Sequence, residues 1–451
     1  MNDLQSEHPM LQSQHLGELQ SECHLHLYGC LPKEALFRLG DERRKQHPTR
    51  FQWFLAEFKK STGVTLDPEN WWGKGGSFET FKKDVLFTSP APFEIFQAKF
   101  NLLIALFPAI PDDLDLATAV FEQHAKEGGY KEYRAFLPMA LSLEDRIKYL
   151  RQLTEAACSY DSASYHPRLA ISLPRQDTAA LDSYQFLTHF LDTHPDLAKW
   201  ITGIDFCASE HTHFPSAKKT LFQQVRNDNL RRTHHLGILY HVGEMWQDIA
   251  IHSAARWCVE AAQIGANRLG HALALGLNCN SLFGQVIKES PSETEDTFRW
   301  LRQFRGTLHD FGFTSGDYGW FARRAELSIK EGQTHWFYDR DLVEQTTLFQ
   351  NAAMSMVQAL GPIVESCPTS NMRIGGLTSE SHHPLKRFAD NDLNFVIATD
   401  DPGIFDIDLR SEENFATAHL GLSSSQLRES NRRTESIFTN LGEPLGPRAH
   451  S

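Results

Sequence analysis

The chain has 451 residues, of which 41% are hydrophobic and 22% are charged, and its formal net charge is −13 at pH 7. These proportions are typical of a folded globular protein. The acidic total argues against nucleic acid as the main partner, because phosphate backbones are bound by basic surfaces. The chain shows no secretory signal pattern, no segment near the ~20 apolar residues of a membrane span, and no regular spacing of its seven Cys. We therefore expect a cytoplasmic protein that does not enter a membrane.

Eight short apolar segments, each ending in charged or small polar residues, recur along the chain. In chain order they read CHLHLYG, YKEYRAFLP, RLAISLPR, ITGIDFCASE, LGILYHVGE, NRLGHALAL, PIVESCPTSN and LNFVIATDDP. Most are separated by stretches whose apolar residues fall at helical spacing. Strands that alternate with helices predict a parallel sheet, and from the second to the sixth segment the repeat of roughly 30–40 residues fits the βα unit of a (β/α)8 TIM barrel.

A barrel of this kind takes about 250 residues, so the chain must carry insertions. The two longest intervals are about 30–125, after the first predicted strand, and about 278–342, after the sixth. We expect both to be helical. No Pro, Gly or Ser-rich linker separates domains, so residues 1–451 are predicted to form one elaborated α/β barrel domain. For the 278–342 insertion we expect an external decoration or a homo-oligomer contact, and the alternative is a lid that selects a larger or modified substrate.

The first predicted strand places His24 and His26 in alternation, so both side chains would point to the same side. This pair alone is weak evidence for a metal site, because a chain with 22 His contains about one His-x-His pair by chance. A second such pair, His211 and His213, has no assigned role. The first pair therefore needs partners from elsewhere in the chain.

Such partners follow the later predicted strands, at the ends where barrel enzymes form their active sites. They are His241 and Glu244 after the fifth strand, His271 after the sixth, and Asp400 and Asp401 after the eighth. Three His and one Asp are a plausible ligand set for a zinc ion that keeps one position open for water. One Glu, one His and one Asp then remain for proton transfer. Each motif is weak by itself, but together they predict one site.

The motifs HLHLYG, HVGE, RLGHAL, CPTSN and ATDDPGIF resemble those of the adenosine deaminase family in the amidohydrolase superfamily. The resemblance covers about 22–440 outside the two insertions. It implies zinc-dependent hydrolytic deamination of a 6-aminopurine, with a metal bound by His24, His26, His241 and Asp400. One zinc ion per chain is implied, because the fourth strand lacks the metal-bridging lysine typical of binuclear relatives.

The resemblance also implies how the remaining residues act. Glu244 would give a proton to purine N1, His271 would orient the attacking water, and Asp401 would bond both that water and purine N7. Protonation at N1 matters because an aromatic C6 resists attack unless the developing charge is removed. The contacts expected for the rest of the substrate come from Tyr28, Phe96, Phe100, Ala208 and Gly243.

Two departures from the family pattern leave the substrate open. Tyr28 stands where the family usually has an acidic residue near the ribose 5′-hydroxyl, and Gln97 makes the flap around Phe96 and Phe100 more polar than usual. The leading expectation is adenosine or deoxyadenosine, and the alternative is an adenine nucleotide or a modified adenosine derivative. An alternative of another class is a nucleoside-binding or assembly protein that has lost catalysis. In each case the expected partner is a small purine nucleoside or nucleotide.

Overall fold

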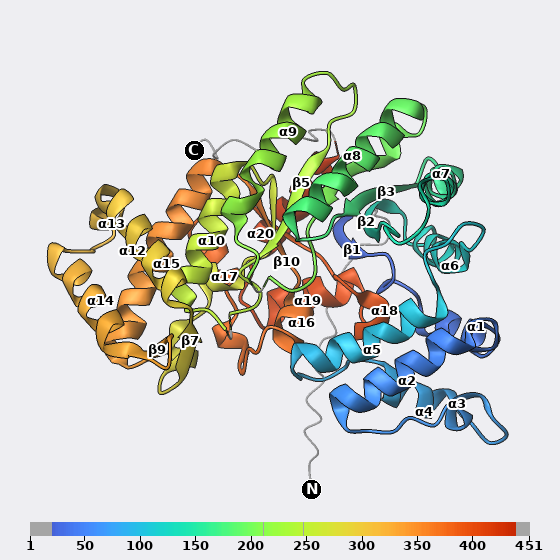
Figure 1. Cartoon of the computed structure of the whole chain (residues 1–451), viewed down its shortest axis with the longest axis horizontal. Coiled ribbons are helices and arrows are strands. Elements are labelled where there is room, and N and C mark those ends of the chain that lie inside the picture. Colours follow the sequence, from blue (N-terminus) through green and yellow to red (C-terminus); the bar gives the residue numbers. More distant parts are fainter. Residues whose placement is uncertain (1–19, 211, 247, 439–451) are drawn as a thin grey trace, which may run out of the picture.

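The computed structural model describes residues 20–210, 212–246 and 248–438. Its centre is an eight-stranded parallel sheet with the strand order β1-β2-β3-β4-β5-β6-β10-β11 (Figure 1). The strands are β1 (Glu22–His26), β2 (Gly129–Phe136), β3 (Tyr165–Ser172), β4 (Ile201–Asp205), β5 (Gly237–Val242), β6 (Arg268–His271), β10 (Ile363–Ser366) and β11 (Phe395–Ile397). All eight lie within or against the segments predicted from the sequence, so the predicted strands are confirmed.

The sheet closes on itself between its first and last strands. The His26 amide donates to the carbonyl of Asp400 at 2.9 Å, and the Asp400 amide donates to the carbonyl of His24 at 3.1 Å. Closure brings two segments more than 370 positions apart into contact at the C-terminal ends of the strands. The predicted (β/α)8 TIM barrel is therefore confirmed.

Helices cover the outside of the barrel, which explains why its strands read as apolar runs. Every residue of β5 is buried, as expected for a parallel strand covered on both faces. The longer helices outside the insertions are α7 (Leu143–Tyr160), α8 (Asp177–Thr193), α9 (Lys219–Asn229), α10 (Ile251–Ile264), α15 (Arg340–Leu360), α19 (Leu409–Ala418) and α20 (Ser424–Ile437). Short helical segments are η1 (Ala198–Trp200), η2 (Pro215–Lys218), α11 (Leu273–Gly276), η3 (Cys279–Leu282), α16 (Pro368–Arg373), η4 (Glu380–His382), α17 (Leu385–Asp390) and α18 (Pro402–Phe405). Within the described part of the chain, no helix has the length and apolar character needed to cross a membrane.

The first insertion is helical, as predicted. It contains α1 (Lys33–Gln46), α2 (Pro48–Thr62), α3 (Glu69–Trp72), α4 (Phe78–Val85), α5 (Phe93–Leu106) and α6 (Asp115–His124). Its aromatic side chains pack on one another and join the main hydrophobic core, in which Phe54, Trp71 and Phe81 are almost fully buried. Figure 1 shows α5 running from this insertion towards the middle of the molecule.

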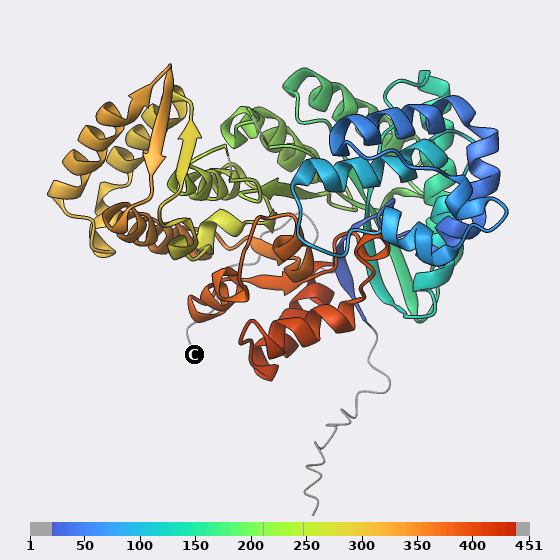
Figure 2. The ribbon, with the colours of Figure 1, turned by 90° about the horizontal axis from the view of Figure 1, so that it is seen from below.

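The second insertion adds strands as well as helices, which the sequence pattern did not indicate. It contains β7 (Val286–Glu289), α12 (Pro291–Gln303), α13 (Arg305–Asp310), α14 (Ser315–Ser328), β8 (Ile329–Lys330) and β9 (Gln333–Phe337). The three strands form an antiparallel sheet in the order β7-β9-β8. Figure 2 shows the two insertions at opposite ends of the molecule. Trp336 and Phe321 of the second insertion pack on the ring of His252 in α10, so the insertion is docked on the barrel through buried aromatic contacts.

Candidate active site

The barrel brings the four predicted metal ligands together at the C-terminal ends of its strands. His24 and His26 lie on β1, His241 lies on β5 and Asp400 follows β11. The ring centroids of His24 and His241 are 4.8 Å apart, and those of His24 and His26 are 5.5 Å apart. Asp400 Oδ1 lies 3.1 Å from Nε2 of His26 and 3.5 Å from Nε2 of His24. Ligand atoms of His24, His26 and His241 lie within 4.8 Å of one another, and so do those of His24, His271 and Asp400.

Three of the converging atoms are buried and lack a hydrogen-bond partner: Nε2 of His24, Nε2 of His241 and Oδ1 of Asp400. Leaving a buried polar atom unpaired costs about 1–3 kcal/mol, so three together call for a common partner. Two imidazoles and a carboxylate are donors that zinc accepts in tetrahedral or five-coordinate geometry. The residues present therefore fit a zinc ion.

Carboxylates behind the imidazoles orient two of the ligands. Nδ1 of His24 lies 2.9 Å from Glu365, and Nδ1 of His241 lies 3.1 Å from Asp205. An imidazole that donates from Nδ1 presents the lone pair of Nε2 to a metal. Burial lowers the pKa of both imidazoles, which favours the neutral form that binds metal. His26 differs: burial lowers its pKa, but the charges of Asp401 and Asp400 raise it to about 9, so a metal would displace a proton there.

A layer of buried charges lies beneath this cluster inside the barrel. The guanidinium groups of Arg134 and Arg268 both contact Glu365, Arg134 Nε lies 3.3 Å from Asp205, and Arg268 also pairs with Glu132. Burial raises the pKa of Glu365, but the two guanidinium groups outweigh it and hold that pKa well below its usual range. Three carboxylates thus face two guanidinium groups, and the excess negative charge suits a cation above them.

The three predicted proton-handling residues stand next to the ligand cluster. His271 Nε2 lies 3.6 Å from Glu244 Oε1 and 4.0 Å from Asp400 Oδ2, and its Nδ1 is held 3.0 Å from Oδ1 of Asn371. Burial raises the pKa of the Glu244 carboxyl. Burial and the adjacent Asp400 charge raise the pKa of Asp401 well above its usual range, and its Oδ1 has no hydrogen-bond partner. His271 and Asp400 both have left-handed backbone angles, with φ of 60° and 68°, a strain that functional sites commonly store.

A cavity of about 100 Å³ opens in front of these groups. Helix α5 of the first insertion forms one wall, to which it contributes Phe96, Gln97 and Phe100. The ring centroids of Phe96 and Phe100 are 5.8 Å apart. Ala208, after β4, lies on another wall. The lining residues are His26, Phe93, Phe96, Gln97, Phe100, Ile104, Phe136, Cys207, Ala208, His241, Glu244, Met245, His271, Ile374, Asp400 and Asp401.

Two of the expected substrate contacts do not line this cavity. The Tyr28 hydroxyl donates to the carbonyl of Phe107 at 2.8 Å and its ring packs near Phe136. The Gly243 amide donates to Glu210 at 2.7 Å. Their contact with substrate stays a prediction. Of the second His-x-His pair, His211 lies outside the described residues, and His213 sits in a loop where its carbonyl accepts from Tyr240.

Several residues that build the site were not singled out from the sequence. Glu365, Asp205 and Asn371 hold imidazole nitrogens, and the Ser370 hydroxyl donates to Asp400 Oδ2 at 2.7 Å. Each lies in a segment already recognised as a strand and its polar end. The sequence could therefore indicate these residues only by their position at the end of a strand. Which partner each one holds depends on the closed barrel.

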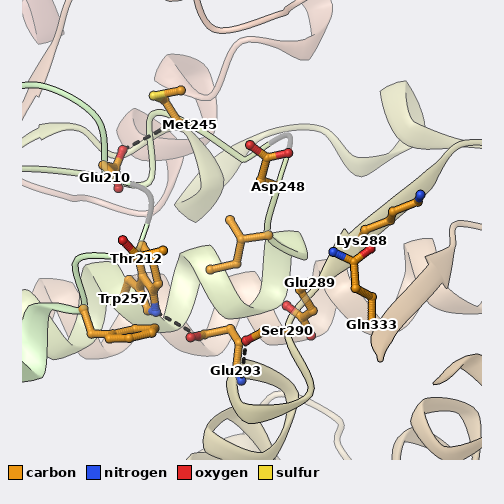
Figure 3. Close-up of a pocket in the computed structure, with 12 residues that line it drawn as sticks. Glu210, Thr212, Met245, Asp248, Trp257, Lys288, Glu289, Ser290, Glu293 and Gln333 are labelled. Atoms are coloured by element: carbon orange, nitrogen blue, oxygen red, sulfur yellow. Dashed lines mark hydrogen bonds between the residues drawn. The ribbon is translucent and has the colours of Figure 1, made fainter. Parts of the chain in front are cut away.

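A second cavity, of about 570 Å³, lies between the barrel and the second insertion (Figure 3). Met245 lines both cavities, so the two are neighbours. The remaining lining residues are Glu210, Thr212, Phe214, Asp248, Ile249, Trp257, Lys288, Glu289, Ser290, Glu293 and Gln333.

Comparison with known proteins agrees with this architecture. The adenosine deaminase family model matches residues 351–438. The adenosine deaminase of Salmonella dublin is 24% identical over 300 residues, which cover 60% of this chain and 87% of that protein.

Two solved structures share the fold. Arabidopsis ADAL complexed with IMP has a TM-score of 0.53 at 14% identity, covering 93% of this chain and 96% of that chain. An amidohydrolase from Burkholderia ambifaria with bound Zn has a TM-score of 0.53 at 14% identity, covering 92% of this chain and 84% of that chain. By its family-model match over residues 351–438 and by its curated relatives, the chain is similar to the adenosine deaminase family.

Proposed function

We propose that this protein is a zinc-dependent hydrolytic deaminase of 6-aminopurine compounds, with adenosine or deoxyadenosine as the leading substrates and one zinc ion per chain. The observation that carries the proposal is the convergence of Nε2 of His24, Nε2 of His241 and Oδ1 of Asp400, all buried and unpartnered, beside the carboxyl group of Glu244. A relative that had lost catalysis would have no reason to keep a metal-binding cluster and a buried acid together.

The reaction adds water to C6 of the purine and releases the 6-amino group as ammonia. His24, His26, His241 and Asp400 would hold a zinc ion, and the ion would supply Lewis-acid activation of the attacking water. Burial raises the pKa of Glu244, which favours the protonated carboxyl group, and this proton can pass to purine N1 as C6 is attacked. His271, fixed by Asn371, and Asp401 flank the attacking water and orient it.

The cavity also bears on the choice between nucleoside and nucleotide. None of the described residues that line it is a Lys or an Arg, and five of them are carried by the largely apolar helix α5. A phosphate group would find neither a Lys ammonium nor an Arg guanidinium group among them, whereas a neutral nucleoside needs none. The alternative, an adenine nucleotide, is supported by the structural neighbour that binds IMP. Because of the residues that line the cavity, we propose a nucleoside rather than a nucleotide as the leading substrate.

Ammonia release from adenine, adenosine, deoxyadenosine and AMP, measured together with the metal content, tests the proposal. We expect about one zinc per chain and the highest kcat/KM with a nucleoside. A preference for AMP of tenfold or more would establish the nucleotide alternative. A protein that binds less than a tenth of an equivalent of zinc, and stays inactive after zinc is added back, would instead be a binding or assembly protein.

A further inference from the structure

The connection between β5 and α10 carries Glu244 and forms part of the wall between the two cavities. It leaves the barrel at Gly243 and reaches α10 at Ala250, and the structure describes it on both sides of residue 247. A connection of this kind can adopt many backbone conformations unless hydrogen bonds to its amides hold it in one of them. What binds them is therefore what places the Glu244 side chain.

A single buried carboxylate holds the beginning of this connection. Glu210, from the loop after β4, is 2% exposed and accepts hydrogen bonds from three consecutive backbone amides. The Gly243 amide donates to its Oε2 at 2.7 Å, and the Glu244 and Met245 amides donate to its Oε1 at 2.9 and 3.1 Å. Figure 3 shows Glu210 next to Met245 at the edge of the larger cavity.

The second insertion holds the other end. Glu289 on β7 is 2% exposed and accepts from the Ala250 amide at 3.1 Å, while the Tyr338 hydroxyl, just after β9, accepts from the Ile251 amide at 2.9 Å. These are the amides of the N-cap residue and of the first residue of α10, a helix that has no side-chain cap of its own. The insertion therefore supplies the acceptors that the N-terminus of a helix needs.

From these contacts, and on the basis of the proposed deaminase function, we propose that Glu210 and Glu289 are positioning residues. They hold the β5–α10 connection from both sides and keep Glu244 directed into the active cavity. The 278–342 insertion thus contributes to turnover through Glu289 without touching the substrate.

The larger cavity offers a matched control in Glu293. This residue also belongs to the second insertion, lines the same cavity and is 3% exposed, but it accepts only from side chains, those of Arg256 and Trp257. Both contacts are made by Oε1, and Oε2 has no partner. In Glu293→Gln the side-chain amide nitrogen can take the position of Oε2, which has no hydrogen-bond partner. In Glu210→Gln and Glu289→Gln it must face an N–H or O–H donor, because all of their partners are donors.

The test compares Glu210→Gln, Glu289→Gln and Glu293→Gln, each loaded with zinc, in two measurements. In steady-state kinetics with the best substrate, we expect kcat to fall at least fivefold in the first two variants with KM within threefold, and both constants to stay within twofold in the third. In hydrogen exchange, we expect the amides of 243–245 in Glu210→Gln and of Ala250 in Glu289→Gln to exchange at least tenfold faster, with no change in Glu293→Gln. A kcat within twofold of wild type in Glu210→Gln, or unchanged exchange at these amides, would overturn the proposal.

The test must also distinguish a failure of this proposal from a variant that does not fold and from a failure of the proposed function. If either Gln variant fails to fold, Glu210→Asp or Glu289→Asp takes its place, since the shorter side chain keeps the charge but withdraws the oxygens by one methylene. The same losses are expected, and their absence would equally overturn the proposal. If the wild-type protein deaminates no purine, the proposed function fails, and the exchange measurement alone decides whether the two carboxylates hold the connection.

Discussion

The hydroxyl of Ser370 donates a 2.7 Å hydrogen bond to Oδ2 of Asp400, and this leaves Oδ1 of the same carboxylate facing the first-strand imidazoles. Oδ1 lies 3.1 Å from Nε2 of His26 and is buried without a hydrogen-bond partner. Ser370 therefore fixes which oxygen of Asp400 is available to a metal. Residues that hold a metal ligand in this way are often nearly as important for affinity as the ligand itself.

We expect Ser370→Ala to weaken zinc binding about 10–100-fold, because the Asp400 carboxylate is then free to rotate. Competition with a chelator of known affinity measures the change. Ser366→Ala is the matched control: this serine on β10 is also buried, but its hydroxyl has no hydrogen-bond partner. If both variants hold zinc equally tightly, Ser370 does not orient Asp400.

Glu244→Gln tests the proton transfer to purine N1. Burial raises the pKa of this carboxyl group, which favours its protonated form, whereas an amide has no acidic proton to give. We expect kcat/KM to fall on the order of a hundredfold or more while the zinc content stays the same, since Glu244 is not among the converging ligand atoms. A fully active Glu244→Gln protein would remove Glu244 from the mechanism, and a zinc-free one would show that it supports the metal site.

The barrel was predictable because its strands are buried on both faces and therefore read as short apolar runs with polar ends. The residues at those ends were predictable for the same reason: a side chain that follows a barrel strand lies at the C-terminal mouth, where His271 is close to both His241 and Asp400. The small antiparallel sheet of the second insertion was not predictable in this way. Its strands have four, two and five residues, and half or more of each is exposed or partly exposed, so they show no apolar run.

The supporting residues were harder to predict because their roles depend on the register of distant segments. Glu365 orients His24 across 341 positions of sequence, and Asp205 orients His241 across 36. Nothing local distinguishes Glu365 from any other acidic residue on a strand. Glu289 is a stronger example, because its contact with Ala250 exists only when the second insertion is docked on the barrel.

Tyr28→Phe tests whether the Tyr28 hydroxyl reaches the substrate. The hydroxyl donates to the Phe107 carbonyl, and Tyr28 is 6% exposed, so its removal leaves a buried acceptor unpaired. We expect the free energy of unfolding to fall by about 1–3 kcal/mol and the ratio of activities with adenosine and AMP to stay the same. Chemical denaturation and the two-substrate assay measure these effects. A changed ratio would mean that Tyr28 turns towards the cavity when substrate binds.

Glu412 predicts a dependence of stability on pH that is separate from catalysis. This residue of α19 is buried, accepts from the Thr369 amide at 2.9 Å through Oε2, and has an unpartnered Oε1. Burial raises the pKa of its carboxyl group from 4.5 to about 7. The folded state therefore binds the proton more tightly than the unfolded state does. The corresponding stability is present in full below the unfolded pKa and is lost as the pH rises towards 7, by an amount on the order of 3 kcal/mol.

Glu412→Gln should remove this dependence. The Gln carbonyl can accept from Thr369 and its amide nitrogen can occupy the place of the unpartnered oxygen, so no buried charge forms at any pH. We expect the variant to be more stable than wild type at pH 8, and the difference between the two proteins to vanish or reverse near pH 4.5. Urea denaturation of both proteins across this range, at equal zinc content, cancels the contribution of the other titrating groups. A constant difference between the two proteins from pH 4.5 to 8 would mean that the Glu412 carboxyl group does not titrate in this range.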